Sequence, residues 1–255
     1  MSLQVHMFPC LSDNYGYLIH DPTSHVTATI DTPDAAAIDA ALAERGWRLT
    51  HILNTHHHFD HAGGNEALKA RWGCTVVGAA NDAERIPGID IRVADGDRLP
   101  LGAATATVLE VPGHTSGHIA YYFPDDGIVF VGDTLFALGC GRLFEGTPAQ
   151  MWNSLQKLMA LPDDTVVYCA HEYTQSNAKF ALSVEPGNRA LVERSGEIDR
   201  LRAGGKPTVP TTIGLEKATN PFLRADSAEL QANVDRMGAA AVEVFAETRR
   251  RKDHF

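Results

Sequence analysis

Short β-branched runs separated by Gly, Pro and Asp fill the first two thirds of the chain, and this pattern predicts strands joined by turns. The runs are HVTATIDT, THILNT, CTVVGAA, IDIRVADGD, TATVLEVPG, GIVFVGD and TVVYCAH. Apolar residues with helical spacing lie between some of them, in AAAIDAALAERG at residues 35–46 and NEALKARWG at residues 65–73. The fold class is therefore α/β, with the strands in a layered sheet.

Helical patterns replace the strand signals from about Tyr173 onward, in TQSNAKFALSV, NRALVERSGEIDRLRAG and residues 227–252. The last run has the spacing of one long amphipathic helix, with apolar residues at Leu230, Val234, Met237, Val242 and Phe245. Asp226 and Glu229 are expected to cap its start. We therefore predict two domains, residues 1–172 rich in strands and residues 173–255 helical.

Composition and charge exclude several classes of protein. Hydrophobic residues make up 44% and charged residues 21%, which is typical of a globular chain. No run of about 18 apolar residues is present, so we expect no membrane span. The start, MSLQVHMFPCLSDNYGYLIHD, has no secretory pattern, so we expect a cytoplasmic protein.

The net charge of −10 argues against nucleic acid or anionic membranes as partners. The sparse cysteines are expected to be reduced: Cys10, Cys74, Cys140 and Cys169.

The stretch NTHHHFDHAGG, residues 54–64, is the densest group of metal-ligand residue types in the chain. It follows the predicted strand HILNT, and side chains two apart on an extended chain share a face, so His56 and His58 can point to one place while His57 points elsewhere. Asp60 and His61 then lie in the turn, and the glycines allow the backbone to bend tightly into the next helix. The spacing HxHxDH therefore suits two adjacent metal ions.

Further ligand-type residues follow three other predicted strands, at His114, Asp133 and His171. A histidine cluster alone could be a surface accident or a hydrogen-bonded network, but that reading would also require chance at each of these strand ends. The donors together are five imidazoles and two carboxylates, too many for one tetrahedral ion. We expect two divalent ions, with zinc the first expectation and iron or manganese also compatible with nitrogen and oxygen donors.

The motifs THHHFDHAGGN, PGHTSGH, FVGDTLF and CAHEYT resemble, in order, those of the metallo-β-lactamase superfamily. DNYGYLI, GDTLFALGCGRLFEGT, HEYT, NPFLR and RRRKDHF are similar to the glyoxalase II (hydroxyacylglutathione hydrolase) family, over residues 7–255. The resemblance implies an αββα sandwich followed by a small C-terminal α-helical domain. It also implies that a metal-bridging hydroxide hydrolyses S-(2-hydroxyacyl)glutathione, typically S-D-lactoylglutathione, to glutathione and D-lactate in methylglyoxal detoxification.

The resemblance also assigns roles to individual residues. One metal would take His56, His58 and His114, and the other would take Asp60, His61 and His171. Asp133 would bridge them, so that Asp60 and Asp133 are the catalytic residues with the hydroxide. The glutathione part would be bound by Arg142, Phe144, Tyr173, Arg249 and Lys252. Some family members have Tyr in place of Phe144, so a hydroxyl contact is missing here, and its effect on glutathione binding stays open.

Alternatives remain at this stage. Without the resemblance, the basic run at residues 249–252 would be read as complementing a helix dipole. A different member of the superfamily, such as a persulfide dioxygenase or a lactonase, would share the metal motifs, and a metal-storage protein would need no open water position. His57 is expected to support or pack behind the ligands, and His118 to be structural. We expect a monomeric enzyme whose partner is a small glutathione thioester.

Overall fold

The computed structural model describes residues 3–255. The chain forms two units, and each is described by itself: the first comprises residues up to Glu110 together with Ser116–Gly132, and the second comprises Val111–Thr115 and Asp133–Phe255. The predicted boundary near residue 172 is drawn from sequence pattern and stays a prediction.

Two sheets make up most of the first unit. One has the order β1-β2-β3-β4-β5-β6, antiparallel from β1 to β3 and parallel from β3 to β6. The strands of the other that lie in this unit run β10-β9-β8-β7 and are antiparallel. The strands are β1 (Gln4–Cys10), β2 (Asn14–Asp21), β3 (Val26–Ile30), β4 (His51–Leu53), β5 (Thr75–Ala79), β6 (Ile91–Val93), β7 (Arg98–Leu101), β8 (Ala104–Glu110), β9 (Ile119–Phe123) and β10 (Ile128–Gly132). Parallel neighbours end at the same edge, so β3, β4 and β5 deliver their following residues to one place.

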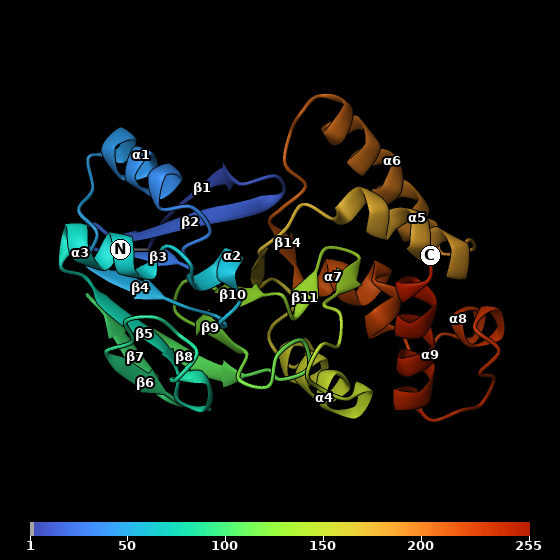
Figure 1. Ribbon diagram of the computed structural model, residues 1–255. Helices are drawn as coiled ribbons and strands as arrows, with labels where there is room; N and C mark the ends of the chain where they lie inside the picture. Colours follow the sequence, from blue (N-terminus) through green and yellow to red (C-terminus); the bar gives the residue numbers. More distant parts are fainter. Residues whose placement is uncertain (1–2) are drawn as a thin grey trace. The chain divides into compact units, whose positions relative to one another are not determined.

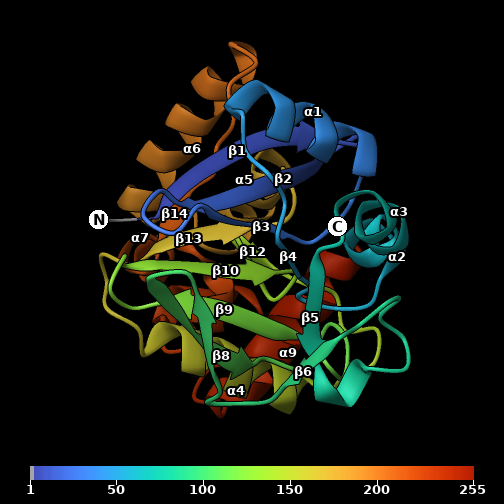
Figure 2. The same cartoon turned by 90° about the vertical axis from the view of Figure 1, so that its left-hand side faces the viewer.

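Helices cover one face of the first sheet (Figures 1 and 2). They are α1 (Ala35–Arg45) and α3 (Asn65–Trp72), while the short α2 (Phe59–Ala62) and the 3₁₀ turn η1 (Ala80–Asp82) lie in the segments after β4 and β5. The carboxylate of Asp34 accepts hydrogen bonds from the first backbone amides of α1, and Gly46 ends the helix at a φ of 66°. Ile38 and Leu42 of α1 pack against Ile52 and other buried residues of the sheet. Both helices predicted in this part of the chain are confirmed.

The opposite face of this sheet packs on the second sheet. The Tyr17 ring lies 5.5 Å from Phe130, centroid to centroid, and the Tyr121 hydroxyl donates to the carbonyl of Asn54 at 2.9 Å. Complete burial raises the pKa of Tyr121 well above its usual value. A buried tyrosine needs such an acceptor, so this bond ties the start of the histidine-rich loop to β9.

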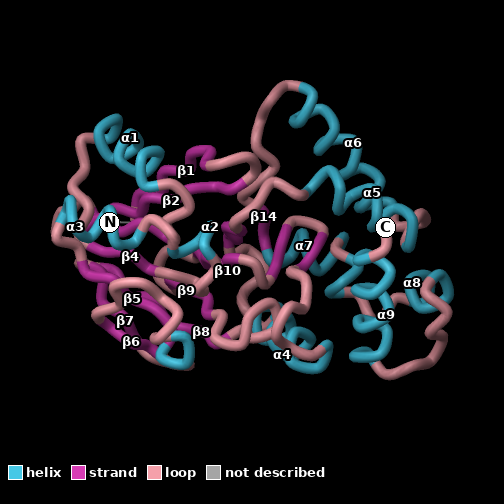
Figure 3. The backbone as a smooth tube through the Cα atoms, in the orientation of Figure 1, coloured by secondary structure: helices cyan, strands magenta, loops and turns pink. Residues whose placement is uncertain are grey.

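The second unit is mainly helical (Figure 3). Its strands are β11 (Leu135–Phe136), β12 (Gly139–Cys140), β13 (Val166–Cys169) and β14 (Thr211–Thr212). Its helices are α4 (Pro148–Met159), α5 (Thr174–Val184), α6 (Arg189–Ala203), α7 (Ile213–Thr219), η2 (Pro221–Leu223), α8 (Ala228–Asn233) and α9 (Ala241–Asp253). The helical patterns predicted at the start of the tail are confirmed as α5 and α6.

The long helix predicted over residues 227–252 is wrong. The run is broken into α8 and α9 because Asp235 and Gly238 take left-handed φ values of 56° and 71° between them. Ser227 caps α8, while Glu229 instead accepts a hydrogen bond from the Gly187 amide at 2.7 Å, so the predicted capping pair is also wrong. Met237, counted as part of the apolar stripe, is 65% exposed at the break.

All four cysteines are buried free thiols, as expected. Burial raises the pKa of Cys140 to about 11 and that of Cys169 to about 12, so both stay neutral near physiological pH. Within residues 3–255, none of the helices has the length and apolar character needed to cross a bilayer.

Candidate metal centre

The loop that follows β4 brings four metal-ligand side chains of the first unit together. His56 Nε2 lies 3.1 Å from His58 Nδ1, and the rings of His56 and His61 are 4.0 Å apart. His61 Nε2 lies 3.4 Å from a carboxylate oxygen of Asp60. His57 points away from this group, as the period-two spacing predicts, and binds Asp82 at 3.0 Å.

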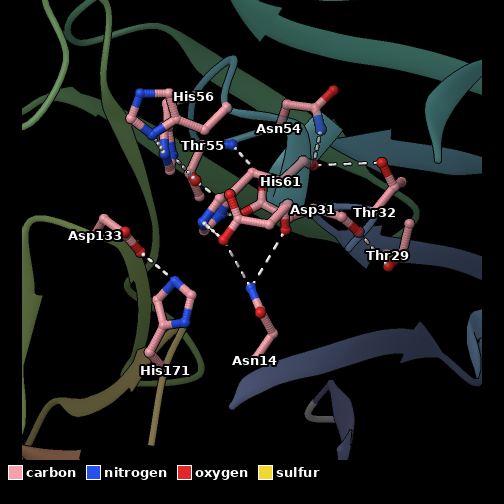
Figure 4. A network of polar contacts seen from close by, with 12 residues as sticks. Asn14, Thr29, Asp31, Thr32, Asn54, Thr55, His56, His61, Asp133 and His171 are labelled. Atoms are coloured by element: carbon pink, nitrogen blue, oxygen red, sulfur yellow. Dashed lines mark hydrogen bonds and ion pairs between the residues drawn. The ribbon is translucent and has the colours of Figure 1, made fainter. Parts of the chain in front are cut away.

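Asp31, at the end of β3, orients this loop from behind (Figure 4). One carboxylate oxygen accepts from the Thr55 amide at 2.7 Å, and the other accepts from the Thr55 hydroxyl and lies 2.8 Å from His61 Nδ1. Fixing Nδ1 of a histidine in this way turns its Nε2 atom toward a metal and raises its basicity as a ligand. Asp31 was missed from the sequence, although it follows a predicted strand just as the other donors do.

Buried amide side chains hold the backbone of the turn that carries His61. Asn54 donates to the His61 carbonyl at 2.8 Å, and Asn65 donates to the Asn54 side-chain oxygen at 2.7 Å. Asn14, from β2, donates to the Asp60 carboxylate at 3.1 Å. Asn14 was quoted within the DNYGYLI motif without a role, and the structure gives it one.

The two glycines of the loop are needed for space rather than for unusual backbone angles. Neither Gly63 nor Gly64 has a positive φ. A Cβ on Gly63 would lie 2.5 Å from the Phe59 carbonyl oxygen, and one on Gly64 would lie 2.8 Å from that of Thr32. The expectation of glycine-specific conformations is therefore wrong, because close backbone approach explains both residues.

Two further histidines pack beside the candidate ligands. His57 binds Asp82, whose carboxylate is fully buried and also accepts from Arg85. Gly117 lies against the same carboxylate. The His118 ring stacks on His56 with centroids 4.6 Å apart. Both positions agree with supporting rather than ligating roles.

The second unit contributes three candidate donors, with two histidines beside the carboxylate of Asp133. His114 Nε2 lies 3.4 Å from one Asp133 carboxylate oxygen, and His171 Nε2 lies 3.3 Å from the other (Figure 4 shows the latter pair). His114 Nδ1 is held at 2.8 Å from the Arg142 carbonyl oxygen, which directs Nε2 toward the carboxylate. Gly141 lies so close to the Asp133 carbonyl that a side chain there could not be accommodated.

Aromatic rings border these histidines. The Tyr173 ring stacks on His171 with centroids 4.7 Å apart and an angle of 1°, and Phe136 lies edge-on to both. Phe144 is 5.1 Å from the His114 ring. Phe144 is 63% exposed and Tyr173 is 39% exposed, so both are accessible beside the second unit's donors.

The basic run of α9 separates into two sets. Arg250 and Arg251 pair with Glu247, and their hydrogen bonds lower the pKa of that carboxyl to about 2. Arg249 and Lys252 lie on another side of the helix with Asp253, which pairs with Arg249 at 2.9 Å. The predicted glutathione-binding residues of α9 are therefore separate from the ion pairs of its neighbours.

Arg249 and Lys252 differ in exposure. Arg249 is 5% exposed and donates to the Cys140 carbonyl at 2.8 Å. Lys252 is partly exposed, with its ammonium 3.3 Å from the Ser176 hydroxyl and 5.5 Å from the Phe180 ring. Burial, Arg249 and Arg142 together lower the pKa of Lys252. Arg142 is largely exposed and 3.9 Å from Asp253.

The donor chemistry fits divalent cations. Imidazole nitrogens and carboxylate oxygens are ligands for zinc, iron and manganese, and the neutral buried thiols are not needed. In each unit, at least one histidine has Nδ1 engaged by an oxygen atom, which is the arrangement expected for ligation through Nε2. Groups of His and Asp side chains in the described residues could hold a metal ion.

Comparisons with known proteins show the family to which the chain belongs. The metallo-beta-lactamase superfamily model matches residues 17–171, and the model described as hydroxyacylglutathione hydrolase C-terminus matches residues 172–255. Hydroxyacylglutathione hydrolases of Methylococcus capsulatus and Maricaulis maris are 58% and 59% identical to this chain over 253 residues, covering 99% of both sequences in each pair. The crystal structure of ETHE1 from Myxococcus xanthus has a TM-score of 0.67 at 29% identity, with full coverage of both chains.

The fold and the donor set thus define a metallo-β-lactamase domain followed by a C-terminal helical domain, as the sequence predicted. This class of protein and the clustered side chains together support binding of divalent metal ions. The chain belongs to the hydroxyacylglutathione hydrolase family, and the resemblance noted from its motifs is confirmed.

Proposed function

We propose that the protein hydrolyses S-(2-hydroxyacyl)glutathione, typically S-D-lactoylglutathione, to glutathione and a 2-hydroxy acid, as a step of methylglyoxal detoxification. The observation that carries the proposal is the position of the donor histidines of a chain that matches hydroxyacylglutathione hydrolases over 99% of its length. His61 and His114 are each held at Nδ1 by an oxygen acceptor and have Nε2 beside a carboxylate.

The proposed centre holds two metal ions. One would be bound by His56, His58 and His114, the other by Asp60, His61 and His171, and Asp133 would bridge them. Asp133 suits the bridging role because its two carboxylate oxygens face different histidines. Zinc is the proposed metal, and iron or manganese would suit the same donors.

When bound, the ions supply a water of lowered pKa as nucleophile and stabilise the negative charge that develops on the thioester carbonyl. The chain's own part is to hold these ions in place. Asp133 and Asp60 would hold them through their carboxylates, and Asp31 lies 2.8 Å from His61 Nδ1, which leaves Nε2 of His61 for a metal. The leaving thiolate comes from a thiol whose pKa is about 8.5, so no strong protein acid is required.

The glutathione part carries two carboxylates, and a chain of net charge −10 must hold them with local positive charge. We propose that Arg142 and Lys252 make these contacts, with Arg249 adding positive charge from a buried position. Tyr173 and Phe144 would pack on the thioester side. Phe144 has no hydroxyl, so its contribution would be apolar contact alone.

We further propose a cytoplasmic monomer with a domain boundary near residue 172. Analytical ultracentrifugation would test the monomer, and limited proteolysis with mass spectrometry would test the boundary.

A substrate panel tests the reaction. Purified protein with bound metal would be assayed with S-D-lactoylglutathione by loss of thioester absorbance, with a lactone by acid release, and with glutathione persulfide by oxygen uptake. We expect thioester hydrolysis to have the highest kcat/KM by a wide margin. Faster lactone turnover or oxygen uptake would contradict the proposal and identify another member of the superfamily.

A further inference from the structure

The segment that follows Asp133 is a short hairpin, residues 135–140, made of β11 and β12. Its two ends matter for the candidate site. Asp133 lies two residues before it, and the carbonyl of Arg142, two residues after it, holds His114. Phe136 within it packs against the His171 ring. A displacement of this hairpin would therefore disturb the three donors of the second unit together.

The hairpin's own ladder is only two residues long on each strand, so it cannot fix its geometry alone. Its tip is anchored by Leu138, which is fully buried in a cluster with residues of α5 and α6. Leu138 also has a φ of 58°, a conformation that non-glycine residues adopt only when their surroundings impose it. Something outside the hairpin must therefore determine its shape.

Side chains of the helical region form hydrogen bonds with the backbone groups of successive hairpin residues. Asn220 donates to the carbonyls of Phe136 and Gly139 at 3.2 and 3.0 Å. Glu216 accepts from the Leu138 amide at 2.9 Å and also binds the Asn220 amide at 3.0 Å. Asn220 is the first residue of the NPFLR motif, for which the proposed reaction provides no role.

Two more side chains donate hydrogen bonds to the backbone of the hairpin. Asn177 of α5 donates to the Ala137 carbonyl at 3.1 Å, and Arg249 of α9 donates to the Cys140 carbonyl at 2.8 Å. A Cβ on Gly139 would lie 2.4 Å from the Asn177 amide nitrogen, so the hairpin and α5 are in close contact. Every residue from 136 to 140 thus has a backbone group bound by a side chain of residues 177–249.

Glu216 is itself fixed. It is fully buried, and its other carboxylate oxygen is bound by Arg194 at 2.5 Å and by the Thr211 hydroxyl at 2.7 Å. A buried carboxylate that is fully paired has one geometry, because any other arrangement leaves a charge without a partner. The Leu138 amide, which donates to Glu216, is therefore held in a defined position.

We propose that Glu216 and Asn220 are positioning residues of the reaction, which set the hairpin so that Asp133 and the Arg142 carbonyl hold the metal-ligand geometry of the second unit. This proposal rests on the proposed metal centre. It assigns the helical region a second task beside glutathione binding, namely to shape a part of the metal centre from residues that touch neither metal nor substrate.

A matched pair of variants separates positioning from plain stability. Glu185 is also a fully buried glutamate of this unit, and its carboxylate is paired with Arg224 at 3.0 Å and with the Ser227 hydroxyl rather than with the hairpin. Glu216→Gln and Glu185→Gln each replace one buried carboxylate by an amide. We expect both to lower the melting temperature by similar amounts.

Only Glu216→Gln should weaken metal binding, by about 10-fold in competition with a chromophoric chelator. At saturating metal it should also lower kcat more than it changes KM. The affinities are compared after allowance for the fraction of each variant that is folded. Equal metal affinity in the two variants would overturn the proposal, whether both keep the wild-type affinity or both lose the same amount. The chelator measurement needs no substrate, so failure of the proposed reaction would be seen separately, as a wild-type protein that binds metal but does not cleave the thioester.

A milder pair applies if Glu216→Gln does not fold. Asn177→Ala removes one amide donor to the hairpin, and Asn233→Ala removes a similar donor to the Val184 carbonyl, 3.0 Å away, elsewhere in the same unit. We expect weaker metal binding for Asn177→Ala and unchanged binding for Asn233→Ala. Unchanged binding in both would overturn the proposal.

Discussion

Two short segments carry most of the proposed metal donors, and they are positioned in different ways. Residues 54–64 supply four donors in a continuous motif whose supports come mainly from neighbouring strand ends and the adjoining helix. The segment from Asp133 to Arg142 supplies one donor and a carbonyl, and its supports come from side chains as far as 109 residues away in the chain. The first segment is supported mainly by side chains within 46 residues in the chain, and the second depends on the tertiary structure of the helices.

The contrast has a functional consequence. A change in a helix of the second unit can reach Asp133 through the hairpin without touching the metal, whereas the donors of residues 54–64 should be insensitive to it. Variants that act on one segment but not on the other can therefore test the comparison.

The largest effect is expected for Asp133→Ala. Loss of the proposed bridging carboxylate should remove bound metal and reduce kcat/KM by more than about 100-fold. Loss of a residue that only supports a metal ligand typically costs up to about 100-fold, and a ligand should cost more. Metal content by plasma mass spectrometry and thioester assays measure both. Asp164→Ala, a change at an exposed carboxylate of the same unit, is the control and should behave as wild type. Metal retention by Asp133→Ala would contradict the ligand assignment.

Asp31→Asn tests the single carboxylate that supports the first segment. An amide at this position cannot accept from both the Thr55 hydroxyl and His61 Nδ1 while also accepting from the Thr55 amide. We expect metal affinity to fall about 10-fold to 100-fold, with the ion proposed at Asp60, His61 and His171 lost first. Chelator competition monitored as ions per chain should show two affinities. Equal loss of affinity for both ions would contradict the assignment of Asp31 to one of the two proposed metal sites.

Lys252→Ala and Arg249→Ala sharpen the division within α9. Lys252 is partly exposed, so its loss should raise KM for the glutathione thioester by about 10-fold with kcat nearly unchanged. Arg249 is buried on the Cys140 carbonyl, so its loss should also lower the melting temperature. Arg250→Ala, the adjacent exposed cation, serves as the control for charge alone. The glutathione assignment would be wrong if Lys252→Ala left KM at the wild-type value.

The smallest effect is expected for Glu247→Gln, on the other set of α9 cations. Hydrogen bonds from Arg250 and Arg251 hold the pKa of Glu247 at about 2, below the ordinary value of about 4.3. A carboxyl with a lowered folded-state pKa adds stability above the unfolded value, and that stability is lost as the pH falls through the folded value. We expect the variant to melt about 2–4 °C lower at neutral pH. The gap should close as the pH falls from about 4 toward 2, and a pH-independent gap would exclude this origin.

The proposed donors could be selected from the sequence because each follows a β-branched run, where a change from apolar to ligand-type residues is visible locally. Asp31 follows the β-branched residues of HVTATIDT, gives the same signal and could have been found. The hydrophobic pattern also predicted α1, α3, α5 and α6, since their apolar faces repeat with helical spacing. The helix α4 was missed, although Thr147, Pro148 and Gln150 form a readable start signal of capping box and first-turn proline.

Other features had no local signal. Nothing in GLEKATN marks Glu216 as a buried carboxylate, because its partners Arg194 and Leu138 are distant in the chain. The break between α8 and α9 depends on the left-handed turn at Asp235 and Gly238, and the apolar spacing continues across it. Long-range hydrogen bonds and backbone angles set by tertiary contacts are therefore the part that the pattern of residues did not predict.

The central claim is a two-ion centre that hydrolyses a glutathione thioester, and a metal titration of the apoprotein tests it most directly. Metal would be removed by chelation, and the rate of S-D-lactoylglutathione hydrolysis would be followed as zinc, iron or manganese is returned in known amounts. The account predicts no turnover without metal and a rate that rises to a plateau at two ions per chain. Thioester hydrolysis by the metal-free protein would contradict it. Binding of two ions per chain without any thioester hydrolysis would contradict it as well.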